Sequence, residues 1–265
     1  MTTRKPAPPT RIVKRGRGHS YYLDGGKVPG VTTIIGKGIP KPQFIDSAVR
    51  DAANYVNDNW DELQTMKPSE RFEAIRSLRW TKLQQGGERG REVHEYVRRY
   101  LAGEDIAPPE DLADLVDAGI AFERDWKVRE LAVECAVFSR EFGYGGRFDL
   151  LAELADKRTW LLDWKTTLSG VWPESALQLA GYRYADFYVV EGDLNGNGAL
   201  VERPMPTVDQ CGVVHLRADG YDLYPLEADA DAAEIFAAAQ IVYGFVESSR
   251  DDWIGDALRP PEEPS

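Results

Sequence analysis

The sequence predicts one α/β or α+β domain, in which a helical N-terminal lobe precedes a mostly antiparallel sheet. Three observations predict this fold. Apolar residues recur at helical spacing over much of 42–128, strand-like runs interrupted by a helix follow over 131–226, and an alanine-rich helical segment covers 229–248. With 43% apolar and 29% charged residues in 265, the composition is that of a globular protein.

The N-terminal half is read as an arm, a hairpin and helices. Residues 1–18, rich in Pro, Lys and Arg, predict a flexible basic arm. Asp24-Gly25-Gly26 predicts a turn between strands at 19–23 and 28–35. Apolar periodicity predicts four helices: from Pro42 to about 56, from about 69 to an interruption at Gly86-Gly87, from about 88 to 101, and over 110–128.

The second half predicts the sheet. Strands are expected at 131–138, 147–154 and Thr159–Lys165, then a helix at 173–188, a hairpin over 212–226 and a helix at 229–248. We therefore expect one domain over 19–250, with a hairpin and helical lobe at 19–128 and a sheet core at 129–226. The acidic, Pro-rich residues 251–265 predict a frayed tail.

Charge and cysteine content set limits on partners and compartment. The net charge is −12, yet residues 1–50 carry ten Lys or Arg against two Asp or Glu, a local charge of +8. A basic arm on an acidic body can meet phosphates locally. Two cysteines cannot form a disulfide framework, and no apolar run indicates a membrane span or a secretory signal. The cytoplasm is the expected location.

Asp163 and Lys165 end an apolar strand, and alternation places them on one face while Trp164 turns to the other. If the hairpin turn before this strand centres near Asp156, Asp149 lies opposite Asp163 on the neighbouring strand, with Cβ atoms roughly 4.5–5.5 Å apart. Two carboxylates at that distance repel each other unless a cation lies between them. The pair therefore predicts a Mg²⁺ or Mn²⁺ site for phosphodiester hydrolysis, in which Lys165 stays cationic and stabilises developing negative charge.

Three further features accompany this pair in order. Gly90 precedes His94 on a helix, Gly145-Gly146-Arg147 precedes Asp149, and Gln178 and Tyr182 share one face of the helix after the strand. Each is unremarkable alone, since a histidine beside an apolar stripe is more often a boundary residue. The aspartates and lysine alone are also compatible with a surface salt bridge on a hairpin.

Together these residues resemble the RecB-like branch of the PD-(D/E)XK nuclease superfamily, whose pattern is G-x-x-x-H, G-x-x-D, D-x-K and Q-x-x-x-Y. The resemblance runs from Gly90 to Tyr182, with weaker likeness to phage exonucleases from about 19 to 226. It implies a restriction-endonuclease-like core, a mixed sheet flanked by helices. It also implies roles for individual residues: metal ligands His94, Asp149, Asp163 and the carbonyl of Trp164; catalytic Asp149, Asp163 and Lys165; and DNA contacts from Gln178, Tyr182 and Arg147.

Related CRISPR-associated exonucleases carry four cysteines for an iron–sulfur cluster. Cys135 and Cys211 cannot supply one, so no cluster is expected. Some relatives place an acidic residue on the strand before G-x-x-D, where Glu134 is the candidate and Glu141 lies nearby. The resemblance implies one or two Mg²⁺ or Mn²⁺ ions and DNA as the substrate.

The leading hypothesis is a DNA exonuclease in phage recombination, working beside a single-strand annealing recombinase in the host cytoplasm. An endonuclease with the same site, and an idle DNA-binding or assembly subunit, are alternatives; a homo-oligomer is compatible with each. A paired-carboxylate glycosidase would explain neither Lys165 nor His94. Residues 193–198 imitate half of a calcium-binding loop, but Pro204 occupies the position of its last ligand.

Overall fold

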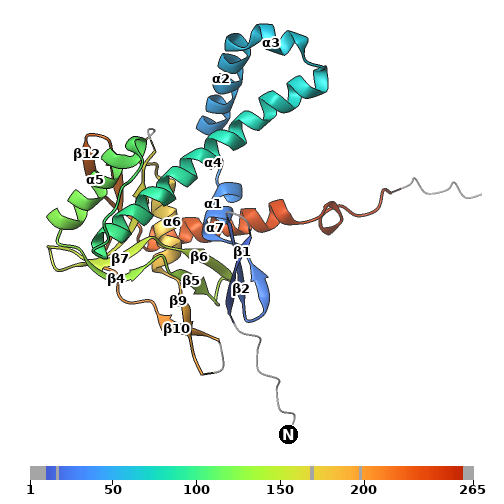
Figure 1. Ribbon diagram of the computed structural model, residues 1–265. Helices are drawn as coiled ribbons and strands as arrows, with labels where there is room; N and C mark the ends of the chain where they lie inside the picture. Colours follow the sequence, from blue (N-terminus) through green and yellow to red (C-terminus); the bar gives the residue numbers. More distant parts are fainter. Residues whose placement is uncertain (1–9, 16–17, 168–169, 197–198, 259–265) are drawn as a thin grey trace, which may run out of the picture.

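The computed structural model describes residues 10–15, 18–167, 170–196 and 199–258. These residues form three β-sheets with helices packed against them (Figure 1). The predicted α/β or α+β class, with a mixed sheet, is therefore confirmed. Within the described ranges, no helix is both long and apolar enough to cross a lipid bilayer.

A five-stranded sheet lies at the centre of the fold, with strand order β12-β11-β8-β7-β4. Strand β8 runs parallel to β11, whereas the other neighbouring strands are antiparallel. The strands span β4 (Arg129–Val133), β7 (Leu150–Glu153), β8 (Thr159–Lys165), β11 (Gln210–Arg217) and β12 (Gly220–Leu226). Because β8 is paired on both sides, its residues are held in a fixed register.

Both faces of this sheet are covered by helices. Successive side chains of a strand point to opposite faces, so each strand contributes to two apolar cores. Leu150 and Leu162 face the core built with α4 (Pro68–Leu101) and α5 (Glu110–Asp125). Leu151 and Leu161 face the core built with α1 (Val31–Gly38), α6 (Glu174–Arg183) and α7 (Ala230–Glu247). Figure 1 shows these helices on either side of the strands.

Two smaller sheets extend the fold beside α1. One has the order β10-β9-β5-β6, and the other is the hairpin sheet β1-β2-β3. Phe138 and Phe187 stack with ring centroids 5.6 Å apart, and Tyr21 meets Phe138 edge-on, which joins the two sheets. The strands span β1 (Arg11–Arg15), β2 (Gly18–Leu23), β3 (Gly26–Val28), β5 (Ala136–Ser139), β6 (Tyr144–Arg147), β9 (Phe187–Leu194) and β10 (Leu200–Pro204).

Helices α2 (Pro42–Asp58), α3 (Trp60–Thr65) and the first half of α4 form a projection that stands away from the sheets (Figure 1). The second half of α4 returns to the body, where Val93 and Val97 are buried. A short 3-10 turn, η1 (Arg250–Asp252), follows α7. The predicted helices from Pro42, over 110–128 and over 229–248 are present with small shifts at their ends.

Three predictions for the N-terminal half are wrong. Residues 31–38 form helix α1, although Val31, Thr32, Thr33, Ile34 and Ile35 favour a strand locally; burial of Val31, Ile34 and Ile35 at helical spacing outweighs that preference. Helix α4 continues through Gly86-Gly87, since each glycine costs only about 1 kcal/mol in a helix that packs at both ends. Residues 11–15 pair with β2 instead of belonging to a flexible arm, while residues 1–9 lie outside the described ranges.

Two predicted strands are each divided. The run at 131–138 falls in β4 and β5, and the run at 147–154 contains Arg147, the last residue of β6, and all of β7. Glu134 has a φ of 46° at the first break, and Phe148-Asp149 forms the second. The backbone nitrogen of Glu134 donates to the carbonyl oxygen of Asp149 at 2.8 Å, so the two breaks lie side by side. The chain passes there from the five-stranded sheet to its neighbour.

Candidate active site

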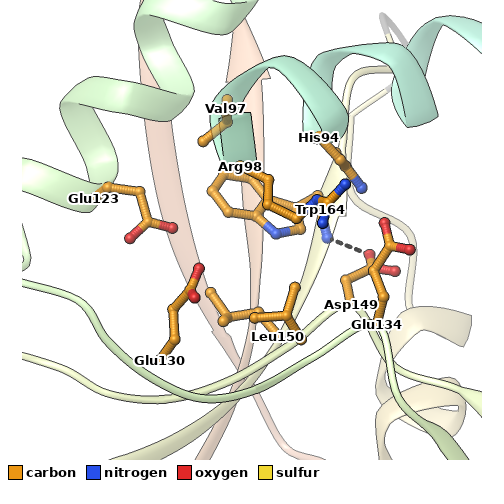
Figure 2. Close-up of a pocket in the computed structure, with 10 residues that line it drawn as sticks. His94, Val97, Arg98, Glu123, Glu130, Glu134, Asp149, Leu150 and Trp164 are labelled. Carbon is orange, nitrogen blue, oxygen red and sulfur yellow. Dashed lines mark hydrogen bonds between the residues drawn. The ribbon is translucent and has the colours of Figure 1, made fainter. Parts of the chain in front are cut away.

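Asp149 and Asp163 lie opposite each other at the end of the β7–β8 pair. Leu150 pairs with Leu162 at the end of the ladder, and Asp149, in the bend before β7, lies close enough for its carboxylate to act on Asp163. Asp149 precedes the first residue of β7, and its Oδ2 accepts a hydrogen bond from the backbone nitrogen of Trp164 at 2.9 Å (Figure 2). The loop and the strand thereby hold the two carboxylates together.

Asp163 is the centre of a polar cluster, although only 3% of its surface is exposed. Lys165 Nζ lies 2.6 Å from Asp163 Oδ2, and Gln178 Nε2 donates to Asp163 Oδ1 at 2.7 Å. Gln178 comes from α6, which packs on β8. The structure thus brings both aspartates, the lysine and the glutamine into one cluster, each within contact of another member.

Burial dominates the electrostatics of these groups. It raises the pKa of Asp149 and of Asp163, and the Asp149 carboxylate raises the pKa of Asp163 further while Lys165 opposes the rise. Burial would lower the pKa of Lys165, but the neighbouring Asp163 and Asp149 outweigh it and the net shift is upward. Lys165 therefore remains an ammonium ion at neutral pH, as expected from the sequence.

His94 approaches the cluster from α4. Its ring centroid is 5.6 Å from that of Trp164, and its Nε2 is enclosed without a hydrogen-bond partner among the described residues. Burial lowers the pKa of His94 to about 4, despite the opposing attraction of Asp163 and Glu134. The imidazole is therefore neutral at physiological pH, which is the form that binds metal ions.

Glu134 and Arg147 form an ion pair beside the aspartates. Arg147 Nη2 lies 2.6 Å from Glu134 Oε2, and Nη1 lies 3.5 Å from Glu191 Oε2 and 3.3 Å from His19 Nε2. Figure 2 shows the Glu134 carboxylate next to Asp149. Glu134, rather than Glu141, thus occupies the position expected for an additional acidic residue, and Arg147 is engaged with carboxylates at the edge of the cluster.

Tyr182 lies behind Gln178. Its side chain is 2% exposed, and its hydroxyl accepts a hydrogen bond from Gln178 Nε2 at 3.3 Å. Gly146 permits this placement, because a Cβ there would lie 2.5 Å from the Tyr182 ring. The phenol therefore offers little surface for the expected DNA contact, and its hydroxyl contacts Gln178 instead.

A small cavity of about 30 Å³ opens between α4, α5 and the sheet. This volume is enough for about one or two water molecules or an ion. His94, Glu134, Asp149 and Trp164 line one end; Glu123 and Glu130 lie at the other (Figure 2). Sequence reasoning missed Glu123, although its place seven residues after Val116 on the apolar face of α5 was a usable signal.

The donor atoms fit a hard divalent cation in type. The enclosed His94 Nε2 has no hydrogen-bond partner in the described part of the chain, the enclosed Asp163 Oδ2 forms an ion pair with Lys165, and Asp149 adds a second carboxylate. In those same ranges, no three His, Cys, Asp or Glu side chains converge closely enough to share an ion. Lys165 and the Trp164 nitrogen instead occupy carboxylate oxygens. The role of metal ligand that the resemblance implies for the Trp164 carbonyl remains a prediction.

Comparison with known proteins adds little to this geometry. No protein-family model matches the sequence, and no curated protein matches it. A solved structure, the crystal structure of SSO0001, is similar to this chain, with 12% sequence identity and a TM-score of 0.27. The match covers 64% of this chain and 91% of that chain. A likeness at that level carries no argument about function.

Proposed function

We propose that this chain is a metal-dependent deoxyribonuclease that hydrolyses phosphodiester bonds, acting as an exonuclease. The observation that carries the proposal is the cluster in which Asp149 accepts a hydrogen bond from the Trp164 backbone, next to Asp163, while Lys165 lies 2.6 Å from Asp163. Two adjacent buried carboxylates beside an ammonium group suit a reaction in which a cation and a lysine together offset negative charge on phosphate.

Asp149, Asp163 and His94 would hold Mg²⁺ or Mn²⁺, with the Trp164 carbonyl as a further ligand. When bound, such an ion polarises phosphate oxygens and favours ionisation of water. His94 is suited to ligation because its imidazole stays neutral above a pKa of about 4. No iron–sulfur cluster is proposed.

Lys165 and Gln178 act on the reacting groups from the other side. The Lys165 ammonium, turned toward Asp163, would orient the attacking water and stabilise charge on the phosphate as the bond breaks. Gln178 holds Asp163 Oδ1 at 2.7 Å and so fixes that carboxylate, and Tyr182 holds Gln178. Arg147, on the edge of the cluster, would contact the DNA backbone on exchanging its carboxylate partners.

The proposed setting is phage DNA recombination or processing in the cytoplasm, with a single-strand annealing recombinase as partner. Cys135 and Cys211 are buried free thiols, which agrees with a reducing compartment. End-dependent cleavage rests on the resemblance to phage exonucleases stated above. An endonuclease would use the same residues, and an idle DNA-binding subunit would keep the fold without the reaction.

The test compares linear with covalently closed circular DNA, in Mg²⁺, in Mn²⁺ and in EDTA. We expect the linear substrate to be degraded only with metal, the circle to stay intact, and Asp163→Asn to be inactive while retaining the wild-type circular dichroism spectrum. A cut circle would favour the endonuclease. Digestion in EDTA, or activity in Asp163→Asn, would contradict the mechanism. DNA binding without cleavage in any metal would leave the assembly subunit as the explanation.

A further inference from the structure

A buried carboxylate lies at the end of the cavity opposite the proposed active site. Glu123, on α5, is only 7% exposed and lines the cavity together with Glu130 of β4. Figure 2 shows their carboxylates turned toward each other, on the far side of Val97 and Leu150 from Asp149. The side chain of Glu123 therefore points at a second acid instead of at a counterion.

No compensating charge reaches Glu123 among the described residues. Its side chain makes no hydrogen bond or ion pair there, and the neighbouring charge that acts on it is Glu130. Arg98 also lines the cavity, but its guanidinium binds Glu95 on the same helix, with Nη2 2.5 Å from Oε2. The remaining wall near the two acids is apolar: Val97, Val133 and Leu150.

Burying an unpaired carboxylate in such a wall is energetically unfavourable, so isolated buried acids are protonated, paired or bound to a cation. Because the neighbour of Glu123 is a second acid, Glu130, Glu123 is not paired with a counterion. Either one of the two acids is protonated, or the pair binds a cation. Glu130 lies on β4, the edge strand of the five-stranded sheet, and is itself exposed. An ion could therefore reach Glu123 from solvent through Glu130.

We propose that Glu123 and Glu130 form a second divalent-cation site, separate from the proposed active site at the other end of the cavity. Its ligands would be the two carboxylates and water, a set typical of Mg²⁺ and Mn²⁺, which keep several waters and bind through one or two carboxylates. The ion joins α5 to β4 and neutralises the buried acid. None of the residues assigned to catalysis takes part, so this proposal does not depend on the nuclease function.

Occupancy of this site should depend on pH. Burial, with a contribution from Glu130, raises the pKa of Glu123 to about 8. A proton therefore competes with the cation below that pH, and binding strengthens as pH rises toward it. The Asp149–Asp163 cluster contains the cationic Lys165, whereas the charge that acts on Glu123 is that of a second acid, Glu130.

The experiment counts Mn²⁺ bound by the full chain, from the electron paramagnetic resonance signal of free Mn²⁺ at pH 8.5 and at pH 6. Wild type is compared with Glu123→Gln, Glu130→Gln and Asp163→Asn. The matched control is Glu234→Gln, which changes an exposed acid on α7. At pH 8.5 we expect Glu123→Gln and Glu130→Gln each to bind one Mn²⁺ fewer than wild type, and Glu234→Gln to bind the same number.

The outcomes separate this proposal from the nuclease. If Glu123→Gln and Glu130→Gln keep the wild-type Mn²⁺ count, the acids share a proton and the second site is excluded, whatever Asp163→Asn does. If they lose one ion while Asp163→Asn loses none, the result supports the second cation site and contradicts metal binding at the proposed active site. Thermal unfolding gives an independent readout: Mn²⁺ should raise the Tm of Glu123→Gln less than that of wild type, and an equal rise would overturn the proposal. If Glu123→Gln does not fold, the Mn²⁺ count and the Tm of Glu130→Gln, which changes an exposed residue, test the proposal.

Discussion

Asp149 and Trp164 are joined by a hydrogen bond between a carboxylate oxygen and a backbone nitrogen 2.9 Å apart. The bond ties the loop between β6 and β7 to the strand that carries Asp163 and Lys165. A buried carboxylate is thereby fixed by the backbone of its neighbour. Groups that are held before a ligand arrives lose less entropy when it binds, so this contact favours a preformed site.

Replacing Lys165 with Gln should lower the rate of DNA hydrolysis by about 10²–10³-fold, the usual loss for one group that stabilises transition-state charge. Lys157→Gln is the matched control, because Lys157 lies on the turn between β7 and β8 with an 81% exposed side chain. The measurement is the release of acid-soluble nucleotide in Mg²⁺. A rate equal to that of the control would remove Lys165 from the mechanism.

Gln178→Ala should move the acid limb of the pH–rate profile to higher pH. Gln178 donates to Asp163 Oδ1, and a donor stabilises the charged carboxylate; losing it raises the pKa of Asp163 further. Tyr182→Phe removes only the hydroxyl that accepts from Gln178, so its shift should be smaller. If Gln178→Ala lowers the rate at every pH but leaves the acid limb of the profile at the same pH, Gln178 does not affect the pKa of Asp163.

His94 should remain neutral down to a pH of about 4, because burial lowers its pKa to that value. The imidazole nitrogen shifts in NMR spectra of metal-free protein would check this, with His94→Gln identifying the resonance. Folding then loses stability as pH falls from about 6.5, where a histidine in the unfolded chain gains its proton, toward 4. A midpoint near 6.5 in the folded protein would mean that the ring is solvated.

Glu123 should give the opposite pH dependence. Its pKa is about 8 in the folded chain, well above the 4.5 of an unperturbed glutamate, so the folded state binds more protons between these values. In EDTA, its contribution to the free energy of unfolding therefore falls as pH rises from about 4.5 to about 8. Urea unfolding across this range should show a shallower fall for Glu123→Gln than for wild type. Parallel curves would contradict a buried, unpaired Glu123.

Gly146→Ala should destabilise the fold by about 1–3 kcal/mol, the usual cost of inserting a methyl group into a packed core. The added Cβ would meet the Tyr182 ring at 2.5 Å, so Gln178 should also shift and activity should fall. Gly244→Ala is the control: nothing lies within 4 Å of a Cβ there, and alanine favours α7 by up to about 1 kcal/mol. Urea unfolding of both variants checks the contrast, and equal stabilities would show that the Tyr182 contact relaxes freely.

The register of the β7–β8 hairpin could be predicted because local information decides it. The run Thr159–Lys165 is apolar until Asp163, and a short turn near Asp156 leaves one pairing that puts Asp149 beside Asp163. Sheet alternation then separates Lys165 from Trp164 without any knowledge of the rest of the fold. The α/β class followed from the order of the elements in the same way.

Other features depend on contacts between distant segments and could not be read locally. Helix α1 forms from β-branched residues because α6 and α7 cover it, and nothing near Val31 indicates those partners. The hairpin of β9 and β10 was missed because its middle resembles a solvated loop. The burial of Tyr182 depends on Gly146, 36 residues earlier, and the acid pair of Glu123 and Glu130 depends on how α5 and β4 are placed around one cavity.

The parallel pairing of β8 with β11 has a consequence for synthesis of the chain. Asp163 pairs with Val213, so β8 gains its second neighbour only after 50 further residues have been made. Contacts of such separation form late, because loop-closure entropy must be overcome first. A nascent or truncated polypeptide that stops before β11 therefore lacks the strand that holds β8, with Asp163 and Lys165, on its second side.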